Sequence, residues 1–167
     1  MDHLWSPWRY QYLQQAPEPD QGCLFCRKAA EQRDAENYVV HRARANFVIL
    51  NLYPYTTGHL MVVPYEHVAT LAQAQPGTLA EMMELTRQAE RALAAIYKPH
   101  GFNLGMNVGE AAGAGIAGHI HMHVLPRWRG DANFLSTVGE TRVMPEELNC
   151  TYEKLLREFA LPEGTRL

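Results

Sequence analysis

The sequence has few cysteines, no excess of basic residues and no long uninterrupted apolar run. It contains 3 cysteines in 167 residues, and the Cys23-x-x-Cys26 pair indicates a metal or redox site rather than a disulfide framework. A net charge of −3 provides no basic footprint for DNA or RNA. Because no segment approaches the roughly 18 apolar residues of a membrane span, and no secretory signal opens the chain, we expect no membrane contact and a cytoplasmic location.

The composition is that of a globular protein, with 47% hydrophobic and 20% charged residues. Strand-like apolar runs in the middle of the chain, with helical patterns beside them, predict an α+β domain. We expect a five-stranded, mainly antiparallel sheet with one long helix packed on it. The expected parts are an aromatic N-terminal arm over residues 1–20, a central domain over 21–134 and a C-terminal helical extension over 135–167.

The expected strands cover residues 38–41, 47–52, 59–64, 102–108 and 119–126. The second and third are joined tightly enough to form a hairpin. Thr78-Leu79-Ala80-Glu81 matches a capping box, which predicts the start of the long helix. Met82 and Met83 are expected to fill the core beneath that helix.

A last helix is expected from Pro145 onward. Its buried stripe would consist of Leu148, Tyr152, Leu155, Leu156 and Phe159.

Histidine alternates with an apolar residue from position 119 to position 124, and a period of two is typical of a strand with two different faces. His119, His121 and His123 would therefore form a row, with neighbours about 6.5–7 Å apart. A single histidine on a strand is more often a satisfied polar side chain. Three in alternation favour metal ligation or phosphate chemistry, because neutral imidazole is both a ligand and a nucleophile.

A glycine-rich loop, Gly113-Ala114-Gly115-Ile116-Ala117-Gly118, comes directly before the histidines. Its G-x-G-x-x-G spacing does not indicate a dinucleotide fingerprint, because that motif must leave a strand and open a helix. Glycines do allow the backbone to approach a ligand and present N–H groups to phosphate oxygens. The alternative is a merely tight turn.

Cys23 and Cys26 need two further ligands for a tetrahedral zinc site, and His67 and His119 are the histidines we expect to supply them. A redox role for the cysteines is less favoured, because no strand precedes Cys23. The sequence therefore predicts a structural zinc ion and no organic cofactor.

Positions 119–125 resemble the histidine triad family, whose pattern is His-φ-His-φ-His-φ-φ with φ apolar. Asn51, the run at 57–64 and the strand holding Asn107 are also similar, so the resemblance covers about residues 23–127. The opening at 5–9, the Gly-Ala-rich loop and Pro126-Arg127-Trp128 are similar to a bacterial branch that includes diadenosine tetraphosphate phosphorylases, also called ATP adenylyltransferases. Gly115 departs from the glutamine that many triad hydrolases carry four residues before the first histidine.

The resemblance implies that His121 attacks the α-phosphorus of a nucleotide and forms a nucleotidyl-histidine. His121 could attack if its other nitrogen donated to a main-chain carbonyl such as that of His119. His123, His119 and His59 would complete the catalytic set. The expected nucleotide-binding residues are Asn51, Phe47, Ile49, Asn107, Gly113, Gly115, Ile116 and His123.

The reaction most consistent with this resemblance is phosphorolysis of diadenosine tetraphosphate, with inorganic phosphate as acceptor. A triad hydrolase of nucleoside phosphoramidates or dinucleoside polyphosphates would differ in using water and releasing AMP. A non-catalytic nucleotide-binding module and a zinc-dependent hydrolase, with Glu110 or Asp131 as its carboxylate, are further alternatives. The aromatic arm and Trp128 lead us to expect a homodimer or homotetramer.

Overall fold

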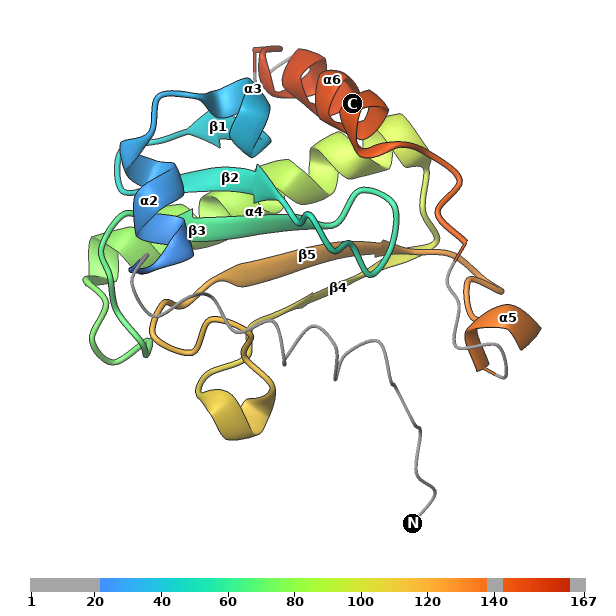
Figure 1. Cartoon of the computed structure of the whole chain (residues 1–167). Helices are drawn as coiled ribbons and strands as arrows, with labels where there is room; N and C mark the ends of the chain where they lie inside the picture. The colour runs from blue at the N-terminus through green and yellow to red at the C-terminus, as the bar shows by residue number, and fades with distance from the viewer. Residues whose placement is uncertain (1–21, 138–142, 163–167) are drawn as a thin grey trace.

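Short apolar strands build one sheet in the computed structural model, which describes residues 22–137 and 143–162 (Figure 1). The strands are β1 (Val39–Arg42), β2 (Asn46–Leu50), β3 (Leu60–Pro64), β4 (Gly101–Gly105) and β5 (Met122–Arg127). Their order is β1-β2-β3-β5-β4, and each neighbouring pair is antiparallel. The predicted α+β class, the five antiparallel strands and the β2–β3 hairpin are confirmed.

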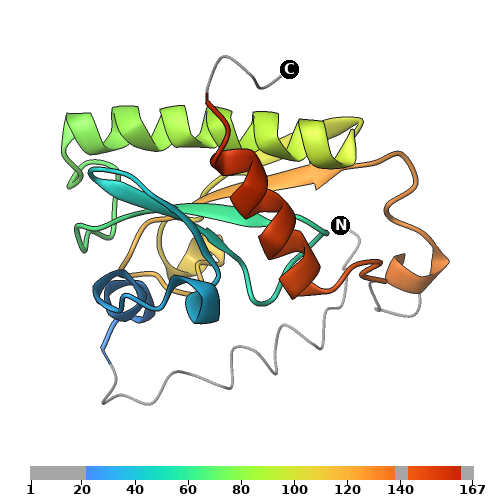
Figure 2. The same cartoon turned by 90° about the horizontal axis from the view of Figure 1, so that it is seen from above.

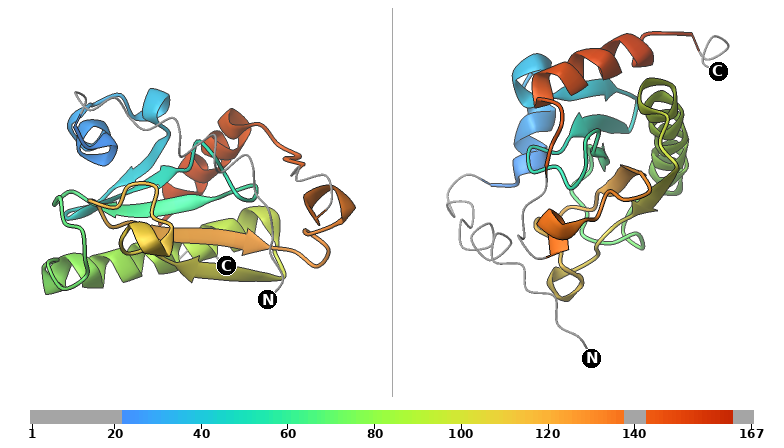
Figure 3. Two further views of the ribbon diagram at one scale, coloured as in Figure 1. Left: turned by 60° about the horizontal axis from the view of Figure 1, so that its bottom comes forward. Right: turned by 90° about the vertical axis from the view of Figure 1, so that its right-hand side faces the viewer.

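The helices lie on both faces of this sheet. They are α2 (Leu24–Ala30), α3 (Asp34–Asn37), α4 (Pro76–Tyr97), α5 (Phe134–Thr137) and α6 (Leu148–Phe159), with a 3₁₀ turn η1 at Glu110–Ala112. Figure 2 and Figure 3 show the long helix α4 along one face and α2 on the opposite face. Of the described helices, none has both the length and the apolar character required to cross a bilayer.

Alternation along each strand divides the core into two layers. In β2, Val48 and Leu50 pack into the layer under α4, whereas Phe47 and Ile49 pack into the layer under α2. Met61 of β3 belongs to the α2 layer and pairs with His123 of β5. The histidine at 123 therefore stands on the face that α2 covers, with apolar neighbours across the sheet.

The start of the long helix differs from the sequence prediction. Helix α4 begins at Pro76, with Gln75 as an N-cap that makes no side-chain cap bond. The Glu81 carboxylate instead accepts hydrogen bonds from the main-chain N–H of Ala45 (2.7 Å) and from Nδ2 of Asn46 (2.9 Å). The predicted capping box is wrong, because tertiary contact with the β1–β2 turn takes the carboxylate.

One of the two methionines expected in the core is also misassigned. Met82 lies on the inner side of α4 and is buried, but Met83 lies on the outer side of the helix and is 58% exposed. The helical spacing alone assigned both methionines to the buried stripe.

Helix α6 packs against α4 and β1 and begins at Leu148 rather than at Pro145. Tyr152, Leu155 and Phe159 are buried as predicted, whereas Leu156 is 37% exposed and does not belong to the buried stripe. The division into arm, domain and extension stays a prediction, and the arm at 1–20 lies outside the described residues.

Candidate active site

A cavity opens on the α2 side of the sheet, at the point where β5 begins. Seven of the eight predicted nucleotide-binding positions line it: Ile49, Asn51, Asn107, Gly113, Gly115, Ile116 and His123. His121, the predicted nucleophile, lines it as well. The strand, the glycine-rich loop and the β2–β3 connection therefore meet around one space.

Phe47 is the predicted binding residue that the structure places elsewhere. It is fully buried in the α2 layer, and its ring stacks on Tyr65 at 5.4 Å between centroids. Phe47 supports the floor of the site without lining the cavity. The cavity is therefore lined without Phe47, which differs from what the sequence predicted for this residue.

The orientation of His121 follows from its hydrogen bond. Its Nδ1 lies 2.9 Å from the main-chain carbonyl oxygen of His119, and because a carbonyl can only accept, Nδ1 carries the proton. In the neutral ring, Nε2 is then unprotonated and carries a free lone pair. Burial lowers the pKa of His121, which favours this neutral form.

His59 and His123 form a directed pair beside it. The main-chain N–H of Tyr55 donates to Nδ1 of His59 at 3.1 Å, so the proton of the neutral His59 ring is on Nε2. That Nε2 lies 2.8 Å from Nδ1 of His123 and donates to it. The remaining nitrogen of His123, Nε2, is therefore a donor, and this side chain lines the cavity.

Burial is the largest cause that keeps these two rings neutral. It lowers the pKa of His59 to about 3, with further contributions from His123 and His121. It lowers the pKa of His123 to about 4, together with the nearby His121 ring. The chain of donors described above is thus the form present at neutral pH.

The glycine-rich loop follows the turn η1 at the mouth of the cavity. Gly113 has φ +85°, a conformation that L side chains rarely adopt, and its carbonyl accepts a hydrogen bond from Nδ2 of Asn107 at 3.4 Å. The loop leads into β5 and not into a helix, as the sequence indicated.

The triad does not form one continuous strand, so the prediction of a three-histidine row on a single strand is wrong. β5 begins at Met122, and the preceding segment leaves the sheet because the N–H of Ile120 donates to the carbonyl of Val68 at 2.8 Å. The rings of His121 and His123 lie 4.8 Å apart, but His119 does not line the cavity. Its ring turns instead toward the cysteines.

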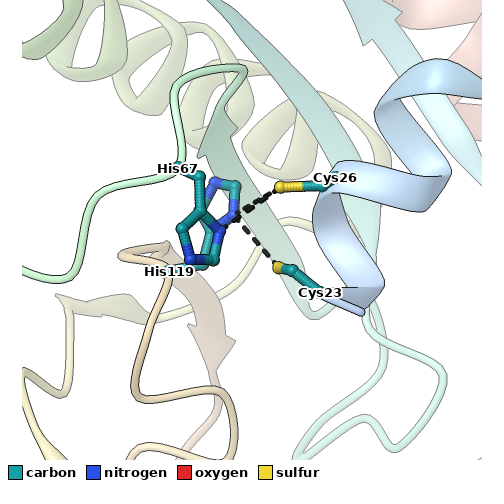
Figure 4. Close-up of side chains that lie close together, drawn as sticks. All are labelled: Cys23, Cys26, His67 and His119. Atoms are coloured by element: carbon teal, nitrogen blue, oxygen red, sulfur yellow. Dashed lines mark hydrogen bonds between the residues drawn. The ribbon is translucent and has the colours of Figure 1, made fainter. Parts of the chain in front are cut away.

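Cys23, Cys26, His67 and His119 form a cluster whose ligand atoms all lie within 4.8 Å of one another (Figure 4). Nδ1 of His119 lies 3.3 Å from Sγ of Cys23 and 3.6 Å from Sγ of Cys26, and Nδ1 of His67 lies 3.3 Å from Sγ of Cys26. Tetrahedral zinc with bonds of about 2.3 Å to sulfur and about 2.0–2.1 Å to nitrogen separates its ligands by similar distances.

The ring of His119 is set for this role by its second nitrogen. Nε2 lies 2.9 Å from the carbonyl oxygen of Pro64 and must donate to it, which leaves the lone pair of Nδ1 directed at the cysteines. The four residues predicted as zinc ligands are thus brought together, and their donor set fits that metal. Asp131, a carboxylate considered for a catalytic zinc, is instead engaged by the Arg127 guanidinium at 2.6 and 2.8 Å.

Several residues that line the site carry no motif and were missed in the sequence, among them Tyr55, Phe25 and Lys28. The Tyr55 ring lies 4.6 Å from that of His59, and Phe25 of α2 lies 5.0 Å from that of His121, both between centroids. Lys28 of α2 lines the cavity although it is 8% exposed. The signal for a helix that covers the site is the apolar pair Leu24 and Phe25, followed by a helix-compatible stretch over residues 27–32.

Comparison with known proteins agrees with this geometry. The sequence matches the HIT domain over residues 32–130. It is 41% identical over 166 residues to a Mycobacterium tuberculosis protein named AP-4-A phosphorylase, covering 96% of this chain and 85% of that protein. It is 27% identical over 93 residues to a Schizosaccharomyces pombe protein named bis(5'-nucleosyl)-tetraphosphatase (asymmetrical), covering 56% of this chain and 50% of that protein.

A solved structure extends the likeness to the fold. The crystal structure of a zinc-bound histidine triad family protein from Mycobacterium smegmatis aligns with a TM-score of 0.68 at 29% identity, covering 83% of this chain and 94% of that one. The chain belongs to the histidine triad (HIT) family.

Proposed function

We propose that the protein is a nucleotidyltransferase that phosphorolyses diadenosine tetraphosphate to ATP and ADP through a nucleotidyl-histidine on His121. The observation that carries this proposal is the hydrogen bond from Nδ1 of His121 to the carbonyl of His119, because it leaves Nε2 as a nucleophile in the cavity. The name of the M. tuberculosis relative, AP-4-A phosphorylase, supports the choice of substrate.

In the first step, the Nε2 lone pair of His121 attacks the α-phosphorus. A P–N bond forms, the bond from that phosphorus to the bridging oxygen breaks, and the bridging oxygen leaves with its electron pair as part of ATP. In the second step an oxygen of inorganic phosphate attacks the same phosphorus, the P–N bond breaks, and ADP is released. The His121 lone pair is restored, so no other reagent is consumed.

His123 and the glycine-rich loop would stabilise the charge that moves during these steps. Nε2–H of His123, held in that tautomer by His59, would donate to the bridging or α-phosphate oxygen. The main-chain N–H of Gly113 already donates to the carbonyl of Glu110 at 2.9 Å, so N–H groups at Gly115 and Ile116, which line the cavity, would donate to the equatorial oxygens. Asn51 would bond the ribose hydroxyls.

We further propose that the cluster of Cys23, Cys26, His67 and His119 holds a structural zinc ion. When bound, zinc would stabilise the fold by fixing α2 to the segment before β5. His119 would then take part in the metal site and, through its carbonyl, in positioning His121. Subunit association and a cytoplasmic location stay predictions.

The competing reaction is hydrolysis, and the likeness to a protein named bis(5'-nucleosyl)-tetraphosphatase (asymmetrical) is its support. Product analysis from diadenosine tetraphosphate, with and without ¹⁸O-labelled phosphate, separates the two. We expect ATP and ADP in equal amounts, with label in the ADP. AMP with ATP at every phosphate concentration would favour the hydrolase. Two molecules of ADP without label would contradict attack at the α-phosphorus by either route.

A further inference from the structure

Lys28 is a buried cation in the wall of the cavity, and the proposed mechanism gives it no role. It lies on α2, its residue is 8% exposed, and it lines the same cavity as His121 and His123. Lysine is seldom buried to this degree without partners, so each N–H donor of its ammonium group is expected to have an acceptor.

Within the described part of the chain, the ammonium group of Lys28 makes one hydrogen bond. Its Nζ donates to Oδ1 of Asn37 at 2.9 Å, and Nδ2 of Asn37 donates in turn to Oε2 of Glu31 at 2.7 Å. A lysine ammonium has three N–H donors. Asn37 thus holds the Lys28 ammonium in place and accepts from one of its N–H groups. The other N–H groups require an acceptor, because an unpaired buried donor is unfavourable.

The register of the sheet places Lys28 far from the phosphate chemistry. His123 of β5 pairs with Met61, Met61 pairs with Ile49, and Ile49 pairs with Val39 of β1. Three strand spacings make this row about 14 Å long. Asn37, the partner of Lys28, lies two residues before Val39, so Lys28 is held near the β1 end while His123 lies at the β5 end.

The wall between the two ends is apolar. Ile49 and Met61 line the cavity from the sheet, and Leu24 and Phe25 line it from α2. A nucleotide with its α-phosphorus at His121 would lay its base along this wall, with the base edge toward Lys28. Because the proposed phosphate chemistry at His121 and His123 lies at the other end of this wall, the part of the nucleotide that reaches Lys28 would be the base and not a phosphate.

We propose that Lys28 is a base-recognition residue, whose Nζ donates a hydrogen bond to a ring-nitrogen acceptor on the edge of a bound adenine. This inference deepens the proposed function and rests on it for the identity of the base. Because the ammonium has donors and no acceptor, the facing edge of adenine is one that presents a ring nitrogen and not the exocyclic amino group. A site built to donate here would discriminate against bases that lack the acceptor.

The test measures binding of AMP and of its 1-deaza, 3-deaza and 7-deaza analogues by calorimetry to the full chain and to Lys28→Met. Each analogue replaces one ring nitrogen by a C–H group. We expect one of the three to bind the unaltered protein about 10- to 100-fold more weakly than AMP. In Lys28→Met that analogue and AMP should bind equally well.

Arg27→Met is the matched control, because it removes the neighbouring positive charge of α2 from a residue that does not line the cavity. It should keep the discrimination of the unaltered protein, and Lys28→Arg, which keeps donors, should keep part of it. Equal binding of all four ligands to the unaltered protein would overturn the inference even if Lys28→Met did not fold. A preference that persists unchanged in folded Lys28→Met would overturn it as well.

Failure of the inference can be told apart from failure of the proposed function by covalent labelling. Capture of α-³²P-labelled nucleotide on His121, together with a flat deaza series, would reject the role of Lys28 alone. Absence of both AMP binding and labelling would reject the proposed function and the inference with it.

Discussion

The main-chain carbonyl of His119 accepts a hydrogen bond from Nδ1 of His121 at 2.9 Å, while the ring of the same His119 belongs to the Cys/His cluster. Phe25 reinforces the link, since its ring lies 5.4 Å from that of His119 and 5.0 Å from that of His121 between centroids. The proposed nucleophile is therefore positioned by the same segment that would hold the metal. Because the nucleophile depends on the main chain of His119 and the cluster on its side chain, substitutions can disturb the metal site and the nucleophile separately.

Loss of one cluster ligand should lower metal content and stability together. For Cys23→Ala we expect less bound zinc per chain and a loss of several kcal/mol in the free energy of unfolding, because metal binding contributes directly to folding. Metal analysis and urea unfolding of the purified variant provide the measurement. Cys150→Ala is the control, since Cys150 is exposed on α6 and is no member of the cluster. Zinc content equal to that of the unaltered protein would exclude Cys23 as a ligand.

Removing the imidazole of His121 should abolish turnover with little effect on binding. We expect His121→Ala to lower kcat on diadenosine tetraphosphate by about 1000-fold or more, because the variant lacks the nucleophile of the proposed mechanism. Steady-state kinetics and rapid-quench labelling would measure this. His100→Ala, which removes an exposed histidine bonded to the N–H of Arg129, should retain activity. Labelled nucleotide trapped on the protein without His121 would contradict the assignment.

His59 should act on the reaction through His123. In His59→Leu the donor to Nδ1 of His123 is lost, so His123 can place its proton on the wrong nitrogen. We expect kcat to fall by about 10- to 1000-fold with KM nearly unchanged. His59→Gln, which retains an N–H donor, should recover part of the loss. Equal kinetics of the two variants would show that His59 fills space and does not set the tautomer.

The sheet could be predicted from the sequence because its signal is local. Phe47, Val48, Ile49 and Leu50 form a continuous apolar run, which predicts a central strand, and both faces of β2 are buried in the structure. The cluster of Cys23 with distant histidines could also be inferred, because few residue types bind zinc. These features depend on residue chemistry and spacing and not on details of packing.

The errors concern side chains whose partners are distant in the chain. Glu81 matched a helix cap, but the β1–β2 turn supplies Ala45 and Asn46 as donors that no local motif reveals. Phe47 and Ile49 look alike in sequence, yet Ile49 lines the cavity while Phe47 packs on Tyr65. Lys28 carried no prediction, because its burial depends on how α2 lies against the sheet and no local pattern reveals that.

Stability should fall in mild acid because His59 and His123 are buried as neutral rings. Their pKa values are about 3 and about 4 in the folded chain, against about 6.5 when unfolded. Between these values the unfolded state binds more protons, so the free energy of unfolding falls as pH decreases below about 6.5. We expect a loss on the order of 1–3 kcal/mol per pH unit near pH 5.5, where carboxylates contribute little.

Urea unfolding at pH 7.5 and pH 5.5 measures this slope. The variant His123→Gln separates the contribution of the His59–His123 pair from that of the other titrating groups. Protonation of the cluster ligands affects the variant and the unaltered protein alike, so the difference between their slopes belongs to the His59–His123 pair. The variant should lose less stability on acidification, since one of the two depressed pKa values is gone. An identical slope in both proteins would mean that the His59–His123 pair takes up no protons on unfolding. Burial would then not be what keeps the two rings neutral in the folded protein.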